Sequence, residues 1–447
     1  MKIFSTIISL ACITVCILSC NESGSIKNEA QSSADVELAA FISKIKAVDN
    51  HAHPNTINPD DKGSDALPLD GLGDIELPVR VRPGSPTWLA AYKGLYGFTG
   101  TELNDKAKNE LKTTMDGVMK EKGDNFPAWV LDQCGTEVMF ANRLYMGPGL
   151  TNSRFRWVTY TDALLFPLST KSEGTTPDQV KLFQLTDEHL KEFLSALNIS
   201  KLPATLDNYM KQIVTATLES QKKGGCIAVK FEAAYLRSLD FGKADMPAAA
   251  KIYSRYASGT VPSHAEYKLL QDFLFHYIAK EAGRLGLAIH IHSFPGAGNY
   301  FAAAGSDPIL LETMFNDPEL NRTKFVLIHG GGPFVAHTSA MLWKPNVYID
   351  ISLLTQLWTP DQLANVLREY LSQFPEKILF GSDAVSFGPG MGWELSAWIA
   401  ATSGRQALGI ALSAMMRSNE ISRGRAEEIA TMVMRSNADS LYHLGLH

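Results

Sequence analysis

Eight short apolar segments recur along the chain, and several of them end in residues that can bind a metal. The first segment, IKAVDNHAH, ends in His51 and His53. Side chains on a strand alternate between its two faces, so these two imidazoles point the same way and can hold a single ion. Later segments end in His292, His329 and Asp383. Four apolar strands that all finish in His or Asp are hard to explain by chance, so we expect their ends to meet in the fold.

Stretches of helical periodicity separate these segments. Strands are expected near residues 45–51, 136–141, 155–160, 226–231, 286–292, 324–329, 346–351 and 378–383. Helical patterns between them include residues 205–222, 265–285 and 360–374. Strand–helix alternation of this kind predicts an α/β fold, the (β/α)8 TIM barrel, whose sites lie at the carboxyl ends of the strands. The metal-type residues all lie at such ends, so the two lines of argument agree.

Two connections are too long for a single helix. Residues 54–130 form a long insertion after the first strand, with a Pro- and Gly-rich start and a helical stretch later. A long loop at the catalytic face is often a lid or a pocket wall. A surface elaboration fits the sequence equally well. The second connection, residues 161–225, is expected to be mostly helical.

The first residues have the pattern of a targeting segment. Lys2 supplies a positive charge, and the apolar run that follows, residues 3–18, is too short for a comfortable membrane span. Cys20 then stands where a bacterial lipoprotein would be lipidated, although an ordinary secretory signal is the alternative. We therefore predict a signal peptide in residues 1–19, a flexible tether in 20–35 and the barrel in 36–447. The expected location is periplasmic or at the cell surface, with a membrane anchor only through Cys20.

Composition narrows the classes of partner and ligand. The formal charge is −6 and no basic block occurs, which disfavours nucleic-acid binding. Outside the leader only Cys134 and Cys226 remain, each in an apolar context, so no disulfide framework is indicated. The metal ligands are therefore expected to be His, Lys and carboxylate. The expected partner is a small-molecule substrate, and a homo-oligomer stays open.

These motifs together resemble the metal-dependent amidohydrolase superfamily, in its amidohydrolase-related branch. The nearest resemblance is to the amidohydrolase domain fused to glutamine synthetase-like domains. The matching pieces are DNHAH (49–53), VK (229–230), YLRSL (235–239), IHS (291–293), LIHGGGPF (327–334), PNVYIDIS (345–352), GSD (381–383), Glu394 and NA (437–438). The resemblance runs from about residue 45 to 445 and is interrupted in 54–130. No glutamine synthetase-like domain follows in this sequence, so the fused family's role in nitrogen metabolism is not expected to transfer directly.

The resemblance implies a set of metal ligands. His51, His53 and Asp383 would hold one divalent ion. His292 and His329 would hold a second, with Lys230 as a bridging N-carboxylysine. Imidazole and carboxylate suit zinc, iron or manganese, and zinc is the metal we expect, as one ion or two. In relatives with a single metal the histidine of the sixth strand is catalytic instead, and His329 would then polarise the substrate carbonyl.

Lys230 interrupts an apolar strand, where a bare ammonium is costly to bury. Three roles stay open for it. It can be a carbamate that bridges two metals, an ammonium that binds a substrate carboxylate, or half of a structural ion pair with Glu232.

Other polar side chains near the strand ends have weaker assignments. His290 is expected to support the ligands rather than to bind metal, and His337 to be structural. Asp49 either orients an imidazole or has a structural role. Four further residues either contact substrate or have an ordinary surface or core role: Tyr235, Arg237, Glu394 and Arg156.

The leading prediction is a metal-dependent hydrolase of C–N, amide-type bonds. Asp383 would act as general base toward a metal-activated water. One alternative is a mononuclear decarboxylase or hydratase of a carboxylated small molecule, and another is a sugar-acid isomerase. A lipoprotein that binds a solute without catalysis is the alternative outside enzymes.

Overall fold

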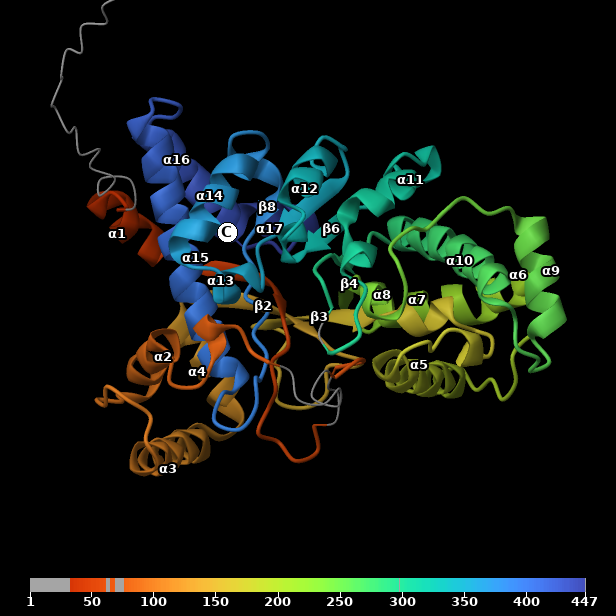
Figure 1. The fold of residues 1–447 in the computed structure, drawn as a ribbon, viewed down its shortest axis with the longest axis horizontal. Coiled ribbons are helices and arrows are strands. Elements are labelled where there is room, and N and C mark those ends of the chain that lie inside the picture. The colour runs from red at the N-terminus through yellow and green to blue at the C-terminus, as the bar shows by residue number, and fades with distance from the viewer. Residues whose placement is uncertain (1–32, 62–64, 69–75, 297, 447) are drawn as a thin grey trace, which may run out of the picture. The chain divides into compact units, whose positions relative to one another are not determined.

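The computed structural model describes residues 33–61, 65–68, 76–296 and 298–446 (Figure 1). The predicted signal peptide, the lipidation site Cys20 and most of the tether lie outside the described residues. Residues Ala34–His447 form one compact unit. In the described part of the chain, no helix is both long enough and apolar enough to cross a bilayer.

Eight parallel strands pair in chain order, each with the next. They are β1 (Ala47–Ala52), β2 (Thr136–Asn142), β3 (Phe155–Tyr160), β4 (Cys226–Phe231), β5 (Ala288–His292), β6 (Phe325–Ile328), β7 (Val347–Asp350) and β8 (Ile378–Leu379). A parallel bridge between Ala52 and Ala384 joins the end of β1 to the segment after β8. The predicted (β/α)8 barrel and all of its expected strands are therefore confirmed, with ends that shift by a few residues.

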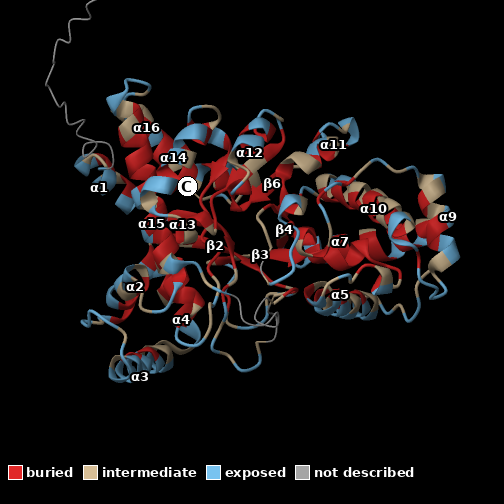
Figure 2. Cartoon of the chain, viewed as in Figure 1, coloured by how far each residue is buried: buried red, intermediate tan, exposed pale blue. Residues whose placement is uncertain are grey.

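Side chains from nearly every strand meet inside the barrel. This inner cluster contains Val48, Val138, Phe140, Val158, Ala228, Ala288, Val326, Ile328 and Leu379. A larger apolar cluster fills the space between the sheet and the helices. Figure 2 shows the strands and the inward faces of the helices buried, with polar faces outside. Burial on both faces explains why the strands are continuous apolar runs rather than alternating ones.

Helices surround the sheet (Figure 1). The main ones are α1 (Val36–Lys44), α5 (Pro177–Ala196), α7 (Ala216–Lys223), α9 (Met246–Tyr256), α10 (His264–Leu285), α12 (Val335–Met341), α14 (Pro360–Leu371), α15 (Trp393–Arg417) and α16 (Arg423–Thr431). Shorter ones are α6 (Leu206–Tyr209), α8 (Ala233–Leu236), α11 (Glu312–Phe315), α13 (Leu354–Leu357) and α17 (Asn437–Tyr442). The connection 161–225 is mostly helical, as predicted. Its expected helix 205–222 contains a π-helical segment, Met210–Thr215.

The insertion after β1 carries η3 (Val79–Val81), α2 (Pro86–Tyr96), α3 (Asp105–Lys122) and α4 (Phe126–Cys134). Helix α2 packs on α15 through a separate apolar cluster that includes Trp88, Tyr92, Leu395 and Ile399. Helix α3 has a largely exposed face (Figure 2). The insertion is therefore anchored to the barrel wall through α2 and α4, and one of its side chains, Asp65, contacts a strand-end histidine described below.

Helix α17 closes the floor of the barrel. The Tyr442 ring meets the Phe140 ring edge to face at 4.7 Å. Its hydroxyl donates to Asn50 Oδ1 at 2.6 Å and lies 2.7 Å from His290 Nε2. The C-terminal helix thus contributes a polar contact to the interior, directly below the histidine strand ends.

Candidate metal centre

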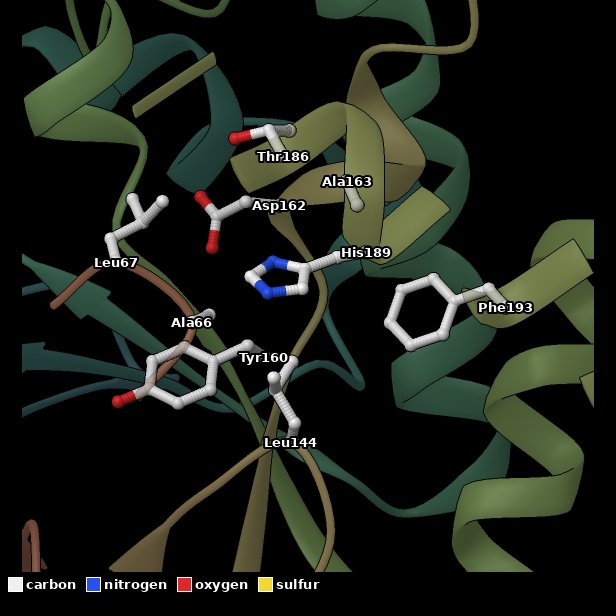
Figure 3. A pocket seen from close by; sticks show the side chains of 9 residues that line it. All are labelled: Ala66, Leu67, Leu144, Tyr160, Asp162, Ala163, Thr186, His189 and Phe193. Carbon is white, nitrogen blue, oxygen red and sulfur yellow. The ribbon is translucent and has the colours of Figure 1, made fainter. Parts of the chain in front are cut away.

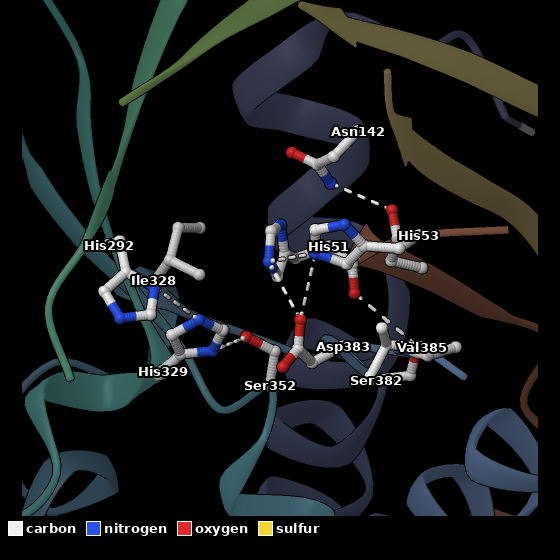
Figure 4. Close-up of polar contacts among 12 residues, drawn as sticks. His51, His53, Asn142, His292, Ile328, His329, Ser352, Ser382, Asp383 and Val385 are labelled. Atoms are coloured by element: carbon white, nitrogen blue, oxygen red, sulfur yellow. Dashed lines mark hydrogen bonds and ion pairs between the residues drawn. The ribbon is translucent and has the colours of Figure 1, made fainter. Parts of the chain in front are cut away.

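The carboxyl ends of five strands bring six predicted residues together. His51 is in β1 with His53 just beyond it, Lys230 is in β4, His292 ends β5, His329 follows β6 and Asp383 follows β8. Figure 4 shows the histidines and Asp383 pointing toward one another. A register shift in β1 between Asp49 and Ala52 breaks strict alternation. Asn50 can therefore reach Tyr442 below, while His51 and His53 both reach Asp383.

The first group consists of His51, His53 and Asp383. Asp383 Oδ1 lies 3.1 Å from His51 Nε2 and 3.2 Å from His53 Nε2. The two imidazole nitrogens are 3.3 Å apart. Three donor atoms thus form a nearly equilateral triangle, while no hydrogen bond or ion pair of the described residues engages Asp383 Oδ2.

The hydrogen-bond network assigns the tautomer of His53. Its Nδ1 lies 2.5 Å from Asp65 Oδ1, and a carboxylate can only accept, so Nδ1 carries the hydrogen. The Tyr160 hydroxyl also donates to Asp65 and lies 3.2 Å from His53 Nδ1. His53 Nε2 is thereby left to face the first group. A carboxylate behind an imidazole is the usual device that orients a metal-binding histidine.

The second group is His292 and His329, with His329 Nε2 3.1 Å from His292 Nδ1. His292 Nε2 lies 3.0 Å from the carbonyl oxygen of Phe294, which can only accept, so Nε2 carries the hydrogen. The lone pair of His292 Nδ1 therefore points at His329.

Asp350 and Ser352 assign the tautomer of His329 in the same way. The Ser352 hydroxyl donates to Asp350 Oδ1 at 2.6 Å, so it must accept from His329 Nδ1 at 2.9 Å. Asp350 also accepts from the backbone N–H groups of His329 and Ser352 and from the Asn50 amide. His329 Nε2 then holds a lone pair, and it faces the lone pair of His292.

The geometry of both groups fits a divalent cation. Two facing lone pairs at 3.1 Å repel each other, and a cation between them relieves that repulsion. Two ligands at a tetrahedral angle on zinc lie roughly 3.3 Å apart, given bonds near 2.0–2.1 Å. The separations in the two groups match this spacing. Ligand atoms of His51, His329 and Asp383 also lie within 4.8 Å of one another, so the groups adjoin.

Lys230 is fully buried, with Nζ 3.3 Å from His51 Nε2. No ion pair joins it to Glu232 among the described residues, so the structure does not show the predicted structural pair. Glu232 Oε2 is itself buried without a hydrogen-bond partner there. Lys230 therefore belongs to the first group by position.

Burial and neighbouring charges shift the pKa values of the first group. Burial disfavours charge on His53, but the carboxylates of Asp65 and Asp383 outweigh it and raise the pKa of His53 to about 10. Burial and the Lys230 charge hold the pKa of His51 well below its usual value. Burial acts to raise the pKa of Asp383, but the adjacent imidazoles, His329 and His51 among them, hold it well below its usual range. Asp383 is thus an ionised acceptor surrounded by imidazoles.

Both His329 and Asp383 have left-handed backbones, with φ of 70° and 56°. Such values are uncommon for residues other than glycine and concentrate at functional sites. The N–H of Asp383 donates to the His51 carbonyl at 2.7 Å, and the N–H of Ser382 donates to Asp49 Oδ1 at 2.8 Å. Asp49 therefore holds backbone groups of β1 and the β8 turn rather than an imidazole.

The predicted substrate contacts lie in different surroundings. The Tyr235 ring packs against the His292 ring at a centroid distance of 4.5 Å. The Arg237 guanidinium is bound to Asp272, Gln271 and backbone carbonyls and is not brought to the ligands. Glu394 is buried at the start of α15, where the Tyr96 hydroxyl donates to it at 3.2 Å. Of the three, only Tyr235 contacts a residue of the two groups.

The remaining predicted residues lie outside the two groups. Arg156 bonds to the carbonyl of Asn152. His337 pairs with Asp307 at 2.7 Å. His290 contacts Tyr442 on the barrel floor.

Behind Tyr160 lies a small cavity of about 10 Å³ (Figure 3). Its polar lining includes Asp162 and His189, and burial raises the pKa of Asp162 to about 7. A space of this size holds roughly one water molecule. The cavity is therefore too small for a substrate, and Tyr160, which lines it, also contacts Asp65 and His53.

Sequence reasoning did not find four residues that support the ligands: Asp65, Tyr160, Asp350 and Ser352. Asp350 and Ser352 lie in the PNVYIDIS segment, and their polar side chains at a predicted strand end could have identified them as candidates. Asp65 stands in an irregular loop, where neither periodicity nor spacing marks it.

Comparisons with known proteins agree with this geometry. Residues 248–444 match the model of the amidohydrolase family Amidohydro_2. This region includes His292, His329 and Asp383 but not the strand ends of β1 and β4. No curated protein matches the chain.

Several solved structures share the fold. A uronate isomerase from Thermotoga maritima has a TM-score of 0.62 at 13% identity, over 92% of this chain and 98% of that one. A proposed metal-dependent hydrolase from Lactobacillus casei ATCC 334 has a TM-score of 0.61 at 15% identity, over 93% and 98%. A glucuronate isomerase from Caulobacter crescentus has a TM-score of 0.59 at 13% identity, over 92% and 94%.

The nearer resemblance, to domains fused with glutamine synthetase-like domains, stays a prediction. The region that matches the family model contains three of the residues that meet at the strand ends, namely His292, His329 and Asp383. Residues 248–444 are therefore similar to the amidohydrolase family, and the barrel as a whole has the fold of the solved structures named above.

Proposed function

We propose that the chain is a metal-dependent hydrolase of C–N, amide-type bonds in a small molecule. The observation that carries this proposal is the pair of facing lone pairs on His292 and His329 beside an ionised Asp383. Binding alone does not require imidazoles and a carboxylate that converge from separate strands. A hydrolytic centre uses the imidazoles to bind metal and the carboxylate to accept a proton from water.

The proposed ligands form two adjoining sites. His51, His53 and Asp383 would hold one cation, and His292 and His329 would hold the second. His329 is proposed as a ligand rather than as a catalytic acid, since its Nε2 has no hydrogen to donate while Nδ1 donates to Ser352. Zinc is the proposed metal because imidazole and carboxylate ligands at this spacing suit it.

Lys230 is proposed to carry a carbamate. A bare ammonium 3.3 Å from His51 Nε2 competes with a cation for that lone pair and repels the cation. Reaction of its amine with carbon dioxide forms an N–C bond and releases a proton. The product is a carboxylate that attracts a cation instead.

A bound divalent cation acidifies water and polarises the substrate carbonyl. The chain's own contribution is to move the proton. Asp383 Oδ2 accepts a proton from the attacking water as the C–O bond forms, while Oδ1 stays with the imidazoles. Asp383 then delivers the proton to the leaving nitrogen as the C–N bond breaks, which yields a carboxylic acid and an amine. Tyr235, stacked on His292, is proposed to form one wall of the substrate pocket.

Isomerisation of a sugar acid is a second candidate, favoured by the barrel shared with two isomerases. An isotope experiment separates the two. After turnover in ¹⁸O-labelled water, hydrolysis places one labelled oxygen in the product carboxylate. Aldose–ketose isomerisation involves no water attack on an acyl carbon.

The test uses a panel of N-acyl and γ-glutamyl amides and a panel of uronates, read by mass spectrometry. We expect labelled carboxylate from an amide, and a loss of about 10²–10⁴-fold in kcat for Asp383→Asn. Asp361→Asn, an exposed carboxylate on α14, is the control. Turnover of a uronate with no label entering its carboxylate, or near-normal amide turnover by Asp383→Asn, would contradict the proposal.

A further inference from the structure

Asp383 has a backbone conformation that needs outside support. Its φ of 56° lies in the left-handed region, which is uncommon for residues other than glycine. The hydrogen bonds from its own N–H and that of Ser382 fix one side of this turn, toward β1. The carbonyl oxygens of Ser382 and Asp383 must be satisfied from the other side.

The side chain of Gln356 satisfies both carbonyls. Gln356 Nε2 donates to the Ser382 carbonyl at 2.7 Å and to the Asp383 carbonyl at 2.9 Å. Since both acceptors are carbonyl oxygens, only the NH₂ end of the amide can face them. Gln356 is fully buried in the short helix α13, after β7. One amide therefore clamps two consecutive peptide units of the turn that carries the proposed base.

Arg80 holds Gln356 in turn. Arg80 Nε donates to the Gln356 carbonyl at 2.9 Å, and Arg80 Nη2 donates to Ser403 Oγ at 2.7 Å. Arg80 belongs to η3 in the insertion, and Ser403 lies in α15. A chain of polar contacts thus runs from the barrel wall through the insertion to the turn of Asp383.

We propose that Gln356 and Arg80 are positioning residues that set the direction of the Asp383 carboxylate. The inference rests on the metal centre of the proposed function. Without the amide clamp, the turn can relax toward the ordinary right-handed or extended backbone. The carboxylate would then leave the position from which Oδ1 meets His51 and His53. The insertion is therefore part of the centre's scaffold, although it supplies no proposed metal ligand.

The test measures metal binding rather than turnover. Cobalt(II) serves as the probe, because its visible absorption reports ligand number and geometry. Wild type, Gln356→Met and Arg80→Ala are titrated with cobalt against a competing chelator, and the thermal midpoint of each protein is recorded. Gln221→Met is the matched control. It removes another buried amide, one that donates to Thr159 away from Asp383.

For Gln356→Met we expect a 10–100-fold loss of cobalt affinity and an altered absorption band, in line with the effect of removing partners that orient metal ligands. Arg80→Ala should show a smaller loss in the same direction. The double variant should lose little more than Gln356→Met alone, because the two residues act through one turn. Gln221→Met should keep the wild-type affinity and band even if its thermal midpoint falls.

Wild-type affinity and absorption in a folded Gln356→Met protein would overturn the positioning role. If that variant does not fold, Arg80→Ala with wild-type affinity and band overturns it equally, because Arg80 is only partly buried and its removal releases the Gln356 backbone that it holds. A wild-type protein that binds no cobalt would instead refute the proposed function itself. The two failures are thus distinguishable.

Discussion

Three imidazoles of the centre carry their hydrogen on the nitrogen that points away from it. His53 donates to Asp65, His292 to the Phe294 carbonyl and His329 to Ser352. Each partner lies on a different segment, so the tautomers are set by the fold and not by the histidine segments themselves. The other ring nitrogen of each faces one of the two adjoining groups. This arrangement is the basis for the proposed cation site.

Asp65→Asn tests whether the contact between Asp65 Oδ1 and His53 Nδ1 supports metal binding. The amide keeps the size of the side chain but removes the charge behind His53 Nδ1. Metal affinity should fall by about 10–100-fold. Titration against a chelator measures it, with the exposed Asp60→Asn of the same loop as control. Equal affinities in the two variants would show that Asp65 does not support the site.

The histidines and Asp383 could be predicted from sequence because each follows a recognisable apolar strand. Their supporting residues could not. Asp65 lies twelve positions past His53 in an irregular loop, and only the folded chain brings it within 2.5 Å of that imidazole. The sequence likewise did not show that Arg237 is already paired with Asp272 of α10 and is therefore not free to bind substrate.

At the scale of elements, α17 seals the barrel floor and reaches the underside of the centre. Tyr442 joins His290 to Asn50, and the Asn50 amide donates to Asp350 at 2.8 Å. Asp350 in turn fixes Ser352 and the His329 backbone. A continuous buried network therefore connects the C-terminal helix to a proposed ligand. The contact of this helix inside the barrel depends on closure of the sheet, so the sequence pattern does not show it.

Tyr442→Phe removes one hydroxyl from this network and leaves the ring packed on Phe140. His290 and Asn50 then lose a partner in a buried site, so unfolding free energy should fall by about 1–3 kcal/mol. Urea denaturation measures the change. Tyr348→Phe is the comparison, because no hydrogen bond of its hydroxyl appears among the described contacts. A loss no larger in Tyr442→Phe than in Tyr348→Phe would count against the network.

Helix α1 gives a pH-dependent prediction. Hydrogen bonds from Arg423 and from the Leu38 N–H lower the pKa of Asp35 from 3.8 to about 2. A lowered pKa stabilises the fold above the unfolded value, and this contribution is lost as pH falls toward about 2. Asp35→Asn keeps a good N-cap but removes the charge.

Wild type should therefore be the more stable protein at neutral pH, with a difference that shrinks between about pH 4 and pH 2. Urea midpoints across this range measure it, with Asp361→Asn, an exposed carboxylate on α14, as control. A difference that stays constant with pH would exclude the charge as its cause.

For the whole molecule, strand–helix alternation was enough to predict the barrel, because its strands are buried on both faces and therefore uniformly apolar. The role of the insertion was not predictable. Its helices pack on α15, and Asp65 and Arg80 approach the centre from loops without periodicity. The reaction itself does not follow from the fold, since hydrolases and isomerases share this barrel. The functional argument rests instead on the facing lone pairs of His292 and His329 and on Asp383 Oδ2, which no described residue engages.

The most direct test of this account is the metal content of protein purified without chelator, by elemental analysis. Wild type and the exposed-histidine control His264→Ala should contain about two divalent ions per chain, and His51→Ala should contain fewer. A wild-type protein that stays free of metal after incubation with zinc, or a His51→Ala protein with undiminished metal content, would contradict it.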